Sequence, residues 1–348
     1  MKRFLTLAAA ILILGSAAHA GFPYREQFDR LLDYLLQNHW DESGNWSGDM
    51  MGDASWFAPA LLFQLGRDEQ KPEYVRMATK TVEWEASLFR AGSKNLQNIK
   101  ISDEEVSVIG GMPGIFYGFK HTGRGEWKTL TEQVLILICS LAKANPETLV
   151  ENFGGDVVVF LSAVSFASYL YHEETGGAQY RRCALEAVEI AGEKHWNEAE
   201  KHYGRLWDWS ASAILLALSG AYRLSGDEKY RARADEVLDT VLDRLWDSEN
   251  GGLISSHFDL KRAKVLSGNN LFAMAVLEWF KAAGDKKHLD LALKTFDFIF
   301  SPALYDGTYP HHHWTAEEGT AEEFCTGCHF HTLFTLYELK KALETGND

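Results

Sequence analysis

The chain has 348 residues and a formal net charge of −15 at pH 7, because 49 Asp and Glu outnumber 34 Lys and Arg. A protein this acidic repels phosphate backbones, which argues against nucleic acid as a partner. Aromatic residues form 13% of the chain and include 11 tryptophans, enough for both a core and a binding surface.

The first twenty residues have the pattern of a secretory signal peptide. Lys2 and Arg3 give a positive start, an apolar run follows from Leu5 to Leu14, and Ala18-His19-Ala20 matches an A-x-A cleavage site. The apolar run is too short for a conventional membrane span. We therefore expect an exported protein, periplasmic or secreted, with no stable membrane anchor. After cleavage near Ala20, residues 21–348 would form one domain, and loss of two positive charges would take the net charge from −15 to −17.

Amphipathic helical stretches alternate with more uniformly apolar ones along the rest of the chain. A polar stripe suits an outer, solvated helix, whereas a helix that is apolar all round is buried. The expected outer helices are 24–39, 72–90, 125–144, 179–193, 229–246 and 286–300. The expected inner helices are 53–65, 105–121, 156–172, 208–224, 269–283 and 328–343.

A glycine-containing turn recurs where each of the first five inner helices passes to the next outer helix. Its glycines are Gly66, Gly123, Gly176, Gly226 and Gly284, which are 57, 53, 50 and 58 residues apart. A near-constant period of this size indicates a repeat architecture, and the repeated unit here is a helical hairpin.

The connections from outer to inner helices are mostly long, at 40–52, 91–104, 196–207, 247–268 and 301–324. They therefore gather at the N-terminal ends of the inner helices. Long loops on a rigid scaffold are where binding and catalytic residues usually lie, so we expect the functional site at this end.

Four inner helices are expected to begin near an acidic residue: Asp53, Glu105, Asp156 and Asp208. Glycoside cleavage needs two carboxyl groups, one protonated and one charged, and this ring could supply them. The alternative is that each residue only caps its helix. Asp208 is the strongest catalytic candidate, because Trp207 and Trp209 flank it.

Aromatic and histidine residues fall at the same end. Five aromatic residues could stack on sugar rings or instead pack loops onto the rim: Trp46, Trp207, Trp209, Tyr309 and Trp314. His331 is a candidate general base, since the ordinary pKa of histidine suits proton abstraction near neutral pH.

The segment Cys325-Thr326-Gly327-Cys328-His329 matches the attachment motif of c-type haem. His329 would then be an axial iron ligand, and the second ligand would come from His311, His312 or His313. Alternatives are a disulfide or redox dithiol and a zinc site. Cys139 and Cys183 are expected to be small core residues.

Three segments carry a resemblance to a known superfamily: Trp246–Leu253 (WDSENGGL), Ser267–Ala273 (SGNNLFA) and Ala283-Gly284-Asp285. Together with the alternating helices, they resemble the six-hairpin glycosidase-like proteins. These include N-acylglucosamine 2-epimerases, unsaturated glucuronyl hydrolases and the helical region of large thioredoxin-domain proteins. The resemblance extends over nearly all of residues 21–348. It implies an all-α (α/α)6 barrel with inner and outer rings of six helices.

The resemblance also implies a carbohydrate-active enzyme, either a glycoside hydrolase or a sugar epimerase, acting on a small saccharide or oligosaccharide. The related hydrolases use carboxylates and the related epimerases use histidines, so the chemistry is general acid–base without a required cofactor. Two other functions stay open: an exported monohaem redox protein on the same scaffold, and a non-catalytic glycan-binding module. Nothing in the sequence indicates the oligomeric state.

Overall fold

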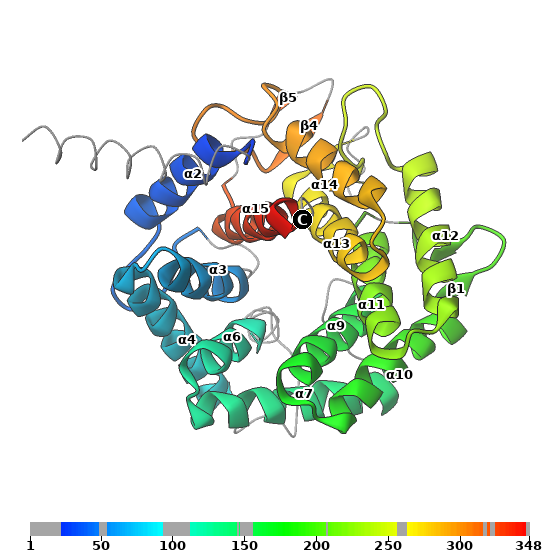
Figure 1. Ribbon diagram of the computed structural model, residues 1–348, viewed down its shortest axis with the longest axis horizontal. Helices are drawn as coiled ribbons and strands as arrows, with labels where there is room; N and C mark the ends of the chain where they lie inside the picture. Colours follow the sequence, from blue (N-terminus) through cyan, green and yellow to red (C-terminus); the bar gives the residue numbers. More distant parts are fainter. Residues whose placement is uncertain are drawn as a thin grey trace, which may run out of the picture.

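The structure is a computed structural model that describes residues 22–48, 54–92, 112–144, 146, 156–206, 208–255, 263–315, 319–320 and 324–345. Twelve α-helices within these ranges form two concentric rings (Figure 1). The inner ring comprises α3 (Ala54–Asp68), α6 (Met112–Thr122), α9 (Val157–Thr175), α11 (Asp208–Ser225), α13 (Leu266–Ala283) and α15 (Thr326–Thr345). The outer ring comprises α2 (Arg25–Asn38), α4 (Pro72–Gly92), α7 (Gly125–Ala144), α10 (Ala178–His195), α12 (Glu228–Arg244) and α14 (Lys286–Ile299). The predicted (α/α)6 barrel is confirmed, with inner and outer helices in the predicted order.

The two rings differ in how their helices are buried, as their sequences predict. In α12 the buried side chains recur at helical spacing on one stripe: Tyr230, Ala234, Val237, Leu238 and Val241. In α11, by contrast, the run from Ser210 to Ala221 is buried on every side. A helix can be enclosed in this way only if neighbours cover its whole circumference, which is the position that the inner ring provides.

The first and last hairpins join to close the ring. The Thr326 N–H donates to the Gly48 carbonyl oxygen at 3.0 Å, and the Lys341 ammonium donates to Gln64 Oε1 at 2.7 Å. The Tyr337 hydroxyl also donates to the Asp68 carboxylate. Contacts between residues more than 250 positions apart therefore hold the barrel shut.

Four of the five predicted turn glycines adopt the left-handed backbone conformation that favours glycine. Their φ angles are 71° at Gly123, 71° at Gly176, 66° at Gly226 and 75° at Gly284. Gly66 is the exception, because it lies inside α3. A Cβ there would come within 2.6 Å of Val75 Cγ2, so this glycine permits close packing of α3 on α4 rather than a turn.

Short strands, which the sequence did not indicate, organise the connections at the opposite end of the barrel. Strands β1 (Trp196–Asn197) and β2 (His202–Tyr203) form a hairpin between α10 and α11. Strands β3 (Lys264–Val265), β4 (His313–Thr315) and β5 (Gly319–Thr320) form a small antiparallel sheet. Because β3 precedes α13 and β4 precedes α15, this sheet ties two outer-to-inner connections together.

A disulfide between Cys139 and Cys183 joins the outer helices α7 and α10. The prediction of a core side chain is confirmed for Cys183, and Cys139 packs against the core. Their pairing was not predicted. Periodicity along one helix cannot show the pairing, because the two sulfur atoms meet only through the packing of two hairpins. Within the described residues, no helix is both long and apolar enough to cross a membrane.

Candidate functional site

A cavity of about 110 Å³ lies on the barrel axis at the N-terminal end of the inner helices, the end where the site was expected. We call it the mouth cavity. Side chains near the starts of α3, α9, α11, α13 and α15 line it: Trp56, Phe57, Val159, Ser162, Ala163, Phe166, Trp209, Ala213, Leu216, Ser267, Leu271 and His331. The lining is mostly apolar and aromatic, and its polar groups are few.

Asp208 does not line the mouth cavity itself, but its sequence neighbour Trp209 does, as does Ser267 next to Gly268. Asp208 is the first residue of α11 and is fully buried. Ser255 Oγ donates to its Oδ1 at 3.0 Å, while its Oδ2 has no hydrogen-bond partner among the described residues. A Cβ on Gly268 would lie 1.9 Å from Oδ2, so only glycine at that position leaves room for the carboxyl group between α11 and α13.

The environment of Asp208 changes its protonation. Burial raises the pKa of its carboxyl group from 3.8 to about 6. The Ser255 hydroxyl and the backbone N–H groups of Trp209 and Asp208 only partly oppose this increase. A carboxyl group with this pKa exists in both protonation states near neutral pH, as general acid–base chemistry requires.

Asp156 has the arrangement of a helix cap. Its Oδ1 accepts hydrogen bonds from the N–H groups of Val158 at 2.8 Å and Val159 at 3.3 Å. Its Oδ2 accepts a hydrogen bond from the Ser210 hydroxyl on α11. Both oxygens are therefore occupied within the described structure. The position of Asp156 is therefore explained by its role as the N-cap of α9, and its hydrogen bond with Ser210 links α9 to α11.

His331 faces the mouth cavity from α15 and stacks on Phe57, with ring centroids 4.0 Å apart. Its Nε2 has no hydrogen-bond partner among the described residues. Burial lowers the pKa of its imidazole from 6.5 to about 3, so the ring is neutral at physiological pH. A group with so low a pKa is a weak base.

Burial of His331 predicts acid sensitivity. The unfolded chain binds a proton at this residue below pH 6.5 and the folded chain does not, so stability is lost as the pH falls from 6.5 towards 3. Between pH 7 and pH 5 the wild type should lose about 2 kcal/mol more than His331→Gln. Urea unfolding of both proteins at the two pH values measures this difference, and equal losses would contradict the lowered pKa.

Only one described member of the predicted aromatic set, Trp209, lines the mouth cavity. Trp46 is in the core, where its indole N–H donates to Thr81 Oγ1 at 3.0 Å. Tyr309 packs against Phe324 and His329, and the Lys264 ammonium lies 4.8 Å from the ring centroid of Trp314. These three residues pack against other side chains instead of lining the cavity. This agrees with the alternative that they pack the loops onto the rim of the barrel.

Besides Trp209, the aromatic residues Trp56, Phe57 and Phe166 line the cavity, and the sequence analysis did not identify these three. They belong to apolar inner helices whose side chains all appeared to be core. Among the other candidates, Asp53, Glu105 and Trp207 lie outside the described residues.

The haem and zinc expectations for the Cys325–His329 segment are not supported. Cys325 and Cys328 form a disulfide with each other, so their sulfur atoms are not thioethers to a porphyrin. His329 is fully buried, with Nδ1 2.6 Å from the Cys325 carbonyl oxygen and Nε2 2.7 Å from that of Pro310. Neither ring nitrogen is therefore oriented towards a metal.

The three histidines proposed as second ligands lie in the connection that leads to α15. His311 lies 3.8 Å from the Asp306 carboxylate, the His312 carbonyl accepts the Leu266 N–H, and His313 is in strand β4. No group of three or more metal-binding side chains occurs in the part of the chain that the structure describes. Of the alternatives considered for Cys325 and Cys328, the structure shows the disulfide.

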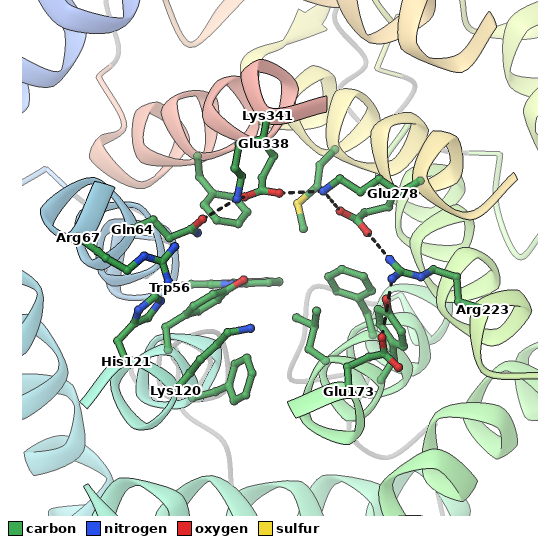
Figure 2. A pocket seen from close by; sticks show the side chains of 18 residues that line it. Trp56, Gln64, Arg67, Lys120, His121, Glu173, Arg223, Glu278, Glu338 and Lys341 are labelled. Carbon is green, nitrogen blue, oxygen red and sulfur yellow. Dashed lines mark hydrogen bonds and ion pairs between the residues drawn. The ribbon is translucent and has the colours of Figure 1, made fainter. Parts of the chain in front are cut away.

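A larger pocket, of about 400 Å³, opens at the other end of the barrel axis (Figure 2). We call it the polar pocket. All six inner helices line it, mainly with their C-terminal halves, and charged residues dominate its rim. Trp56 and Phe166 line both cavities, so the two are separated by little more than these side chains.

No protein-family model matches this chain, and no curated protein sequence matches it. Solved structures match over nearly the full length. A cellobiose 2-epimerase from Bacillus thermoamylovorans has a TM-score of 0.66 at 11% identity, over 90% of this chain and 97% of that one. The unsaturated glucuronyl hydrolase of Bacillus sp. GL1 has a TM-score of 0.65 at 15% identity, over 91% and 95%. A GH76 α-mannanase from Bacteroides thetaiotaomicron has a TM-score of 0.64 at 13% identity, over 94% and 98%.

The chain therefore shares the (α/α)6 toroid fold of these structures. The similar structures include epimerases, a glycosidase and a lyase of carbohydrates. Because one fold carries several chemistries, the reaction has to be argued from the site.

Proposed function

We propose that the protein is a carbohydrate-active enzyme that uses general acid–base chemistry at the mouth cavity, with Asp208 as the proton-transferring group. The observation that carries this proposal is the fully buried Asp208 carboxyl, with a pKa of about 6 and an oxygen that no described group holds. It lies next in sequence to Trp209, which lines the cavity. An aromatic face beside a proton donor suits a sugar ring and its glycosidic oxygen.

The two candidate groups favour hydrolase-like over epimerase-like chemistry. A proton-transfer group is most effective when its pKa is close to the working pH. The pKa of Asp208 is about 6 and that of His331 about 3. The carboxyl group is therefore better matched to acid–base work at neutral pH than the imidazole is.

Export is part of the proposal. The Cys139–Cys183 and Cys325–Cys328 disulfides would persist in an oxidising compartment, and the first twenty residues have the signal-peptide pattern. The substrate would then be a small saccharide or oligosaccharide outside the cytoplasm.

Asp208→Asn tests the proposed role of this residue. The wild type is first screened on neutral and acidic oligosaccharides, with reducing-end release and NMR as readouts for hydrolysis and epimerisation. On a confirmed substrate, Asp208→Asn should lower kcat by about 100-fold or more, because the amide cannot transfer the proton.

Asp156→Asn is the matched control, since Asp156 also stands at the start of an inner helix but caps it. This variant should keep most of the activity and lose at most about 1 kcal/mol of stability. Turnover of Asp208→Asn within threefold of wild type would remove Asp208 from the reaction. Failure of the folded wild type to convert any saccharide in the panel would count against the enzymatic function.

A further inference from the structure

The charged residues of the polar pocket divide into two groups on facing sides (Figure 2). On one side, acidic and basic residues of α15, α13, α11 and α9 pair with one another. They are Lys341, Glu338, Lys281, Glu278, Arg223 and Glu173. On the other side, α3 and α6 place Arg67, Lys120 and His121 together, and no acidic residue lines the pocket between them. We call the first group the paired wall and the second the basic corner.

The paired wall is a continuous chain of interactions. Lys281 lies 2.7 Å from a Glu278 oxygen and 2.8 Å from a Glu338 oxygen. Arg223 extends the chain, 3.8 Å from Glu278 and 3.7 Å from Glu173. Lys341 also pairs with Glu338. Three basic residues therefore balance three acidic ones, and the wall does not need an ionic ligand. Its carboxylates still have lone pairs that can accept hydrogen bonds from hydroxyl groups.

The basic corner keeps donors that the protein does not use. Among the described residues, Arg67 donates only to Asp68, through Nε at 2.9 Å, which leaves its two terminal nitrogens for a ligand. Lys120 has one ion pair within the same part of the chain, with Glu174 at 3.0 Å. Neither acid lines the pocket. His121 Nε2 is buried without a hydrogen-bond partner among the described residues.

Asp68 and Glu174 pair with Arg67 and Lys120 from outside the pocket lining, so the corner presents only basic groups to the pocket itself. Burial, Arg67 and Lys120 all lower the pKa of His121, to about 4, so the imidazole stays neutral while the other two remain charged. Cations at helix C-termini also compensate the helix dipole, and Arg67 and Lys120 are in the last turns of α3 and α6. Compensation of the helix dipole would explain two basic residues at these helix ends, but it does not explain why both line a cavity of about 400 Å³.

Aromatic side chains form the remaining surface of the polar pocket, among them Trp56, Phe116, Tyr117, Tyr169 and Phe334. The volume falls within the range of small-molecule sites. A ligand that fits this surface has one anionic group for the basic corner, hydroxyl groups for the paired wall, and a face that packs against aromatic rings.

We propose that the polar pocket is a second ligand site, separate from the mouth cavity, and that it binds a sugar acid. The carboxylate would pair with Arg67 and Lys120, in the bidentate manner that suits a guanidinium. The hydroxyl groups would donate to Glu278 and Glu338. This inference is independent of the reaction proposed at the mouth cavity and would survive the loss of that proposal.

Calorimetric titration of the full-length mature protein tests the site, with three probes of similar size: D-glucuronate, D-glucose and D-glucose 6-phosphate. We expect D-glucuronate to bind at least tenfold more tightly than D-glucose. Arg67→Gln and Lys120→Gln should each weaken D-glucuronate binding by about tenfold or more, since each removes a charged hydrogen-bond donor to the carboxylate. Neither change should alter D-glucose binding.

Two controls locate the binding. Lys128→Gln, on the exposed face of α7 and outside the pocket, should leave the D-glucuronate affinity unchanged. Asp208→Asn should also leave the D-glucuronate affinity unchanged while lowering kcat, which separates this site from the proposed active site. Circular dichroism melting of each variant shows whether it is folded.

Several results would overturn the proposal. One is equal affinity for D-glucuronate and D-glucose, and another is no binding of D-glucuronate at millimolar concentration. Unchanged affinity in folded Arg67→Gln and Lys120→Gln would place the binding elsewhere. Tighter binding of D-glucose 6-phosphate than of D-glucuronate would assign the pocket to phosphates instead of sugar acids.

Discussion

Replacing Cys139 and Cys183 with alanine is expected to lower the free energy of unfolding by about 4 kcal/mol. The disulfide connects residues 44 positions apart in sequence and therefore restricts a long loop in the unfolded chain. It also joins two outer helices of different hairpins, α7 and α10, so the folded repeats lose a covalent link when it is removed. Urea denaturation of the wild type and the double variant in non-reducing buffer measures the effect.

The wild type treated with a reducing agent is the control for this prediction. Reduction should bring its stability close to that of the double variant and leave the double variant itself almost unchanged. The Cys325–Cys328 disulfide spans only three positions, so its loss contributes less to the entropy of the unfolded chain. A double variant as stable as the oxidised wild type would contradict a stabilising role for Cys139–Cys183.

Gly114→Ala should be the most disruptive single substitution among the described inner-helix glycines. A Cβ at this position would lie 2.0 Å from the Ser55 carbonyl oxygen and 2.8 Å from Glu85 Oε2. The first of these atoms belongs to the backbone of α3, so it cannot turn away as a side chain can. We expect a loss of about 3 kcal/mol or more, because α3 and α6 would be forced apart. Thermal unfolding followed by circular dichroism reports it.

Gly125→Ala is the matched control. Gly125 is also a helical glycine, at the start of α7, but a Cβ there would meet no atom within 4 Å. Removing glycine from a helix normally stabilises it by a few tenths of a kcal/mol to about 1 kcal/mol. A Gly114→Ala variant that unfolds at the wild-type temperature would show that α3 and α6 do not pack as closely as described.

The carboxyl group of Glu85, which lies close to Gly114, has an unusual environment. Glu85 projects from the outer helix α4 and is almost fully buried, and neither carboxyl oxygen has a hydrogen-bond partner among the described residues. Burial raises its pKa well above the ordinary value. The group therefore favours its neutral form, which lowers the cost of enclosing it between helices.

The direction of the helices explains why the two ends of the barrel differ. Five inner helices, α3, α9, α11, α13 and α15, line the mouth cavity, largely with their N-terminal halves. All six line the polar pocket, mainly with their C-terminal halves. Helix dipoles stabilise acidic groups at the first end and basic groups at the second. The placement of Asp156 and Asp208 at one end, and of Arg67 and Lys120 at the other, agrees with this polarity.

Local patterns in the sequence were enough to predict the architecture. The spacing of apolar residues separates outer from inner helices, and glycines such as Gly176 and Gly284 mark the turns by their left-handed conformation. Both signals depend on neighbours within one or two helical turns. The order of the helices and their closure into a ring follow from repeating this unit.

The roles of individual residues depend instead on partners that are distant in the sequence, and these come together only in the folded protein. Asp156 and Asp208 both stand at the starts of inner helices, yet one caps its helix and bonds to Ser210 while the other is enclosed against Gly268 with a raised pKa. The pairing of Cys139 with Cys183 and the gathering of Arg67 and Lys120 around one cavity also require several hairpins to pack. Whether a side chain is buried, and which residue it pairs with, depends on side chains from other helices. The spacing of residues within one helix carries no information about those neighbours, so only the closed barrel decides these properties.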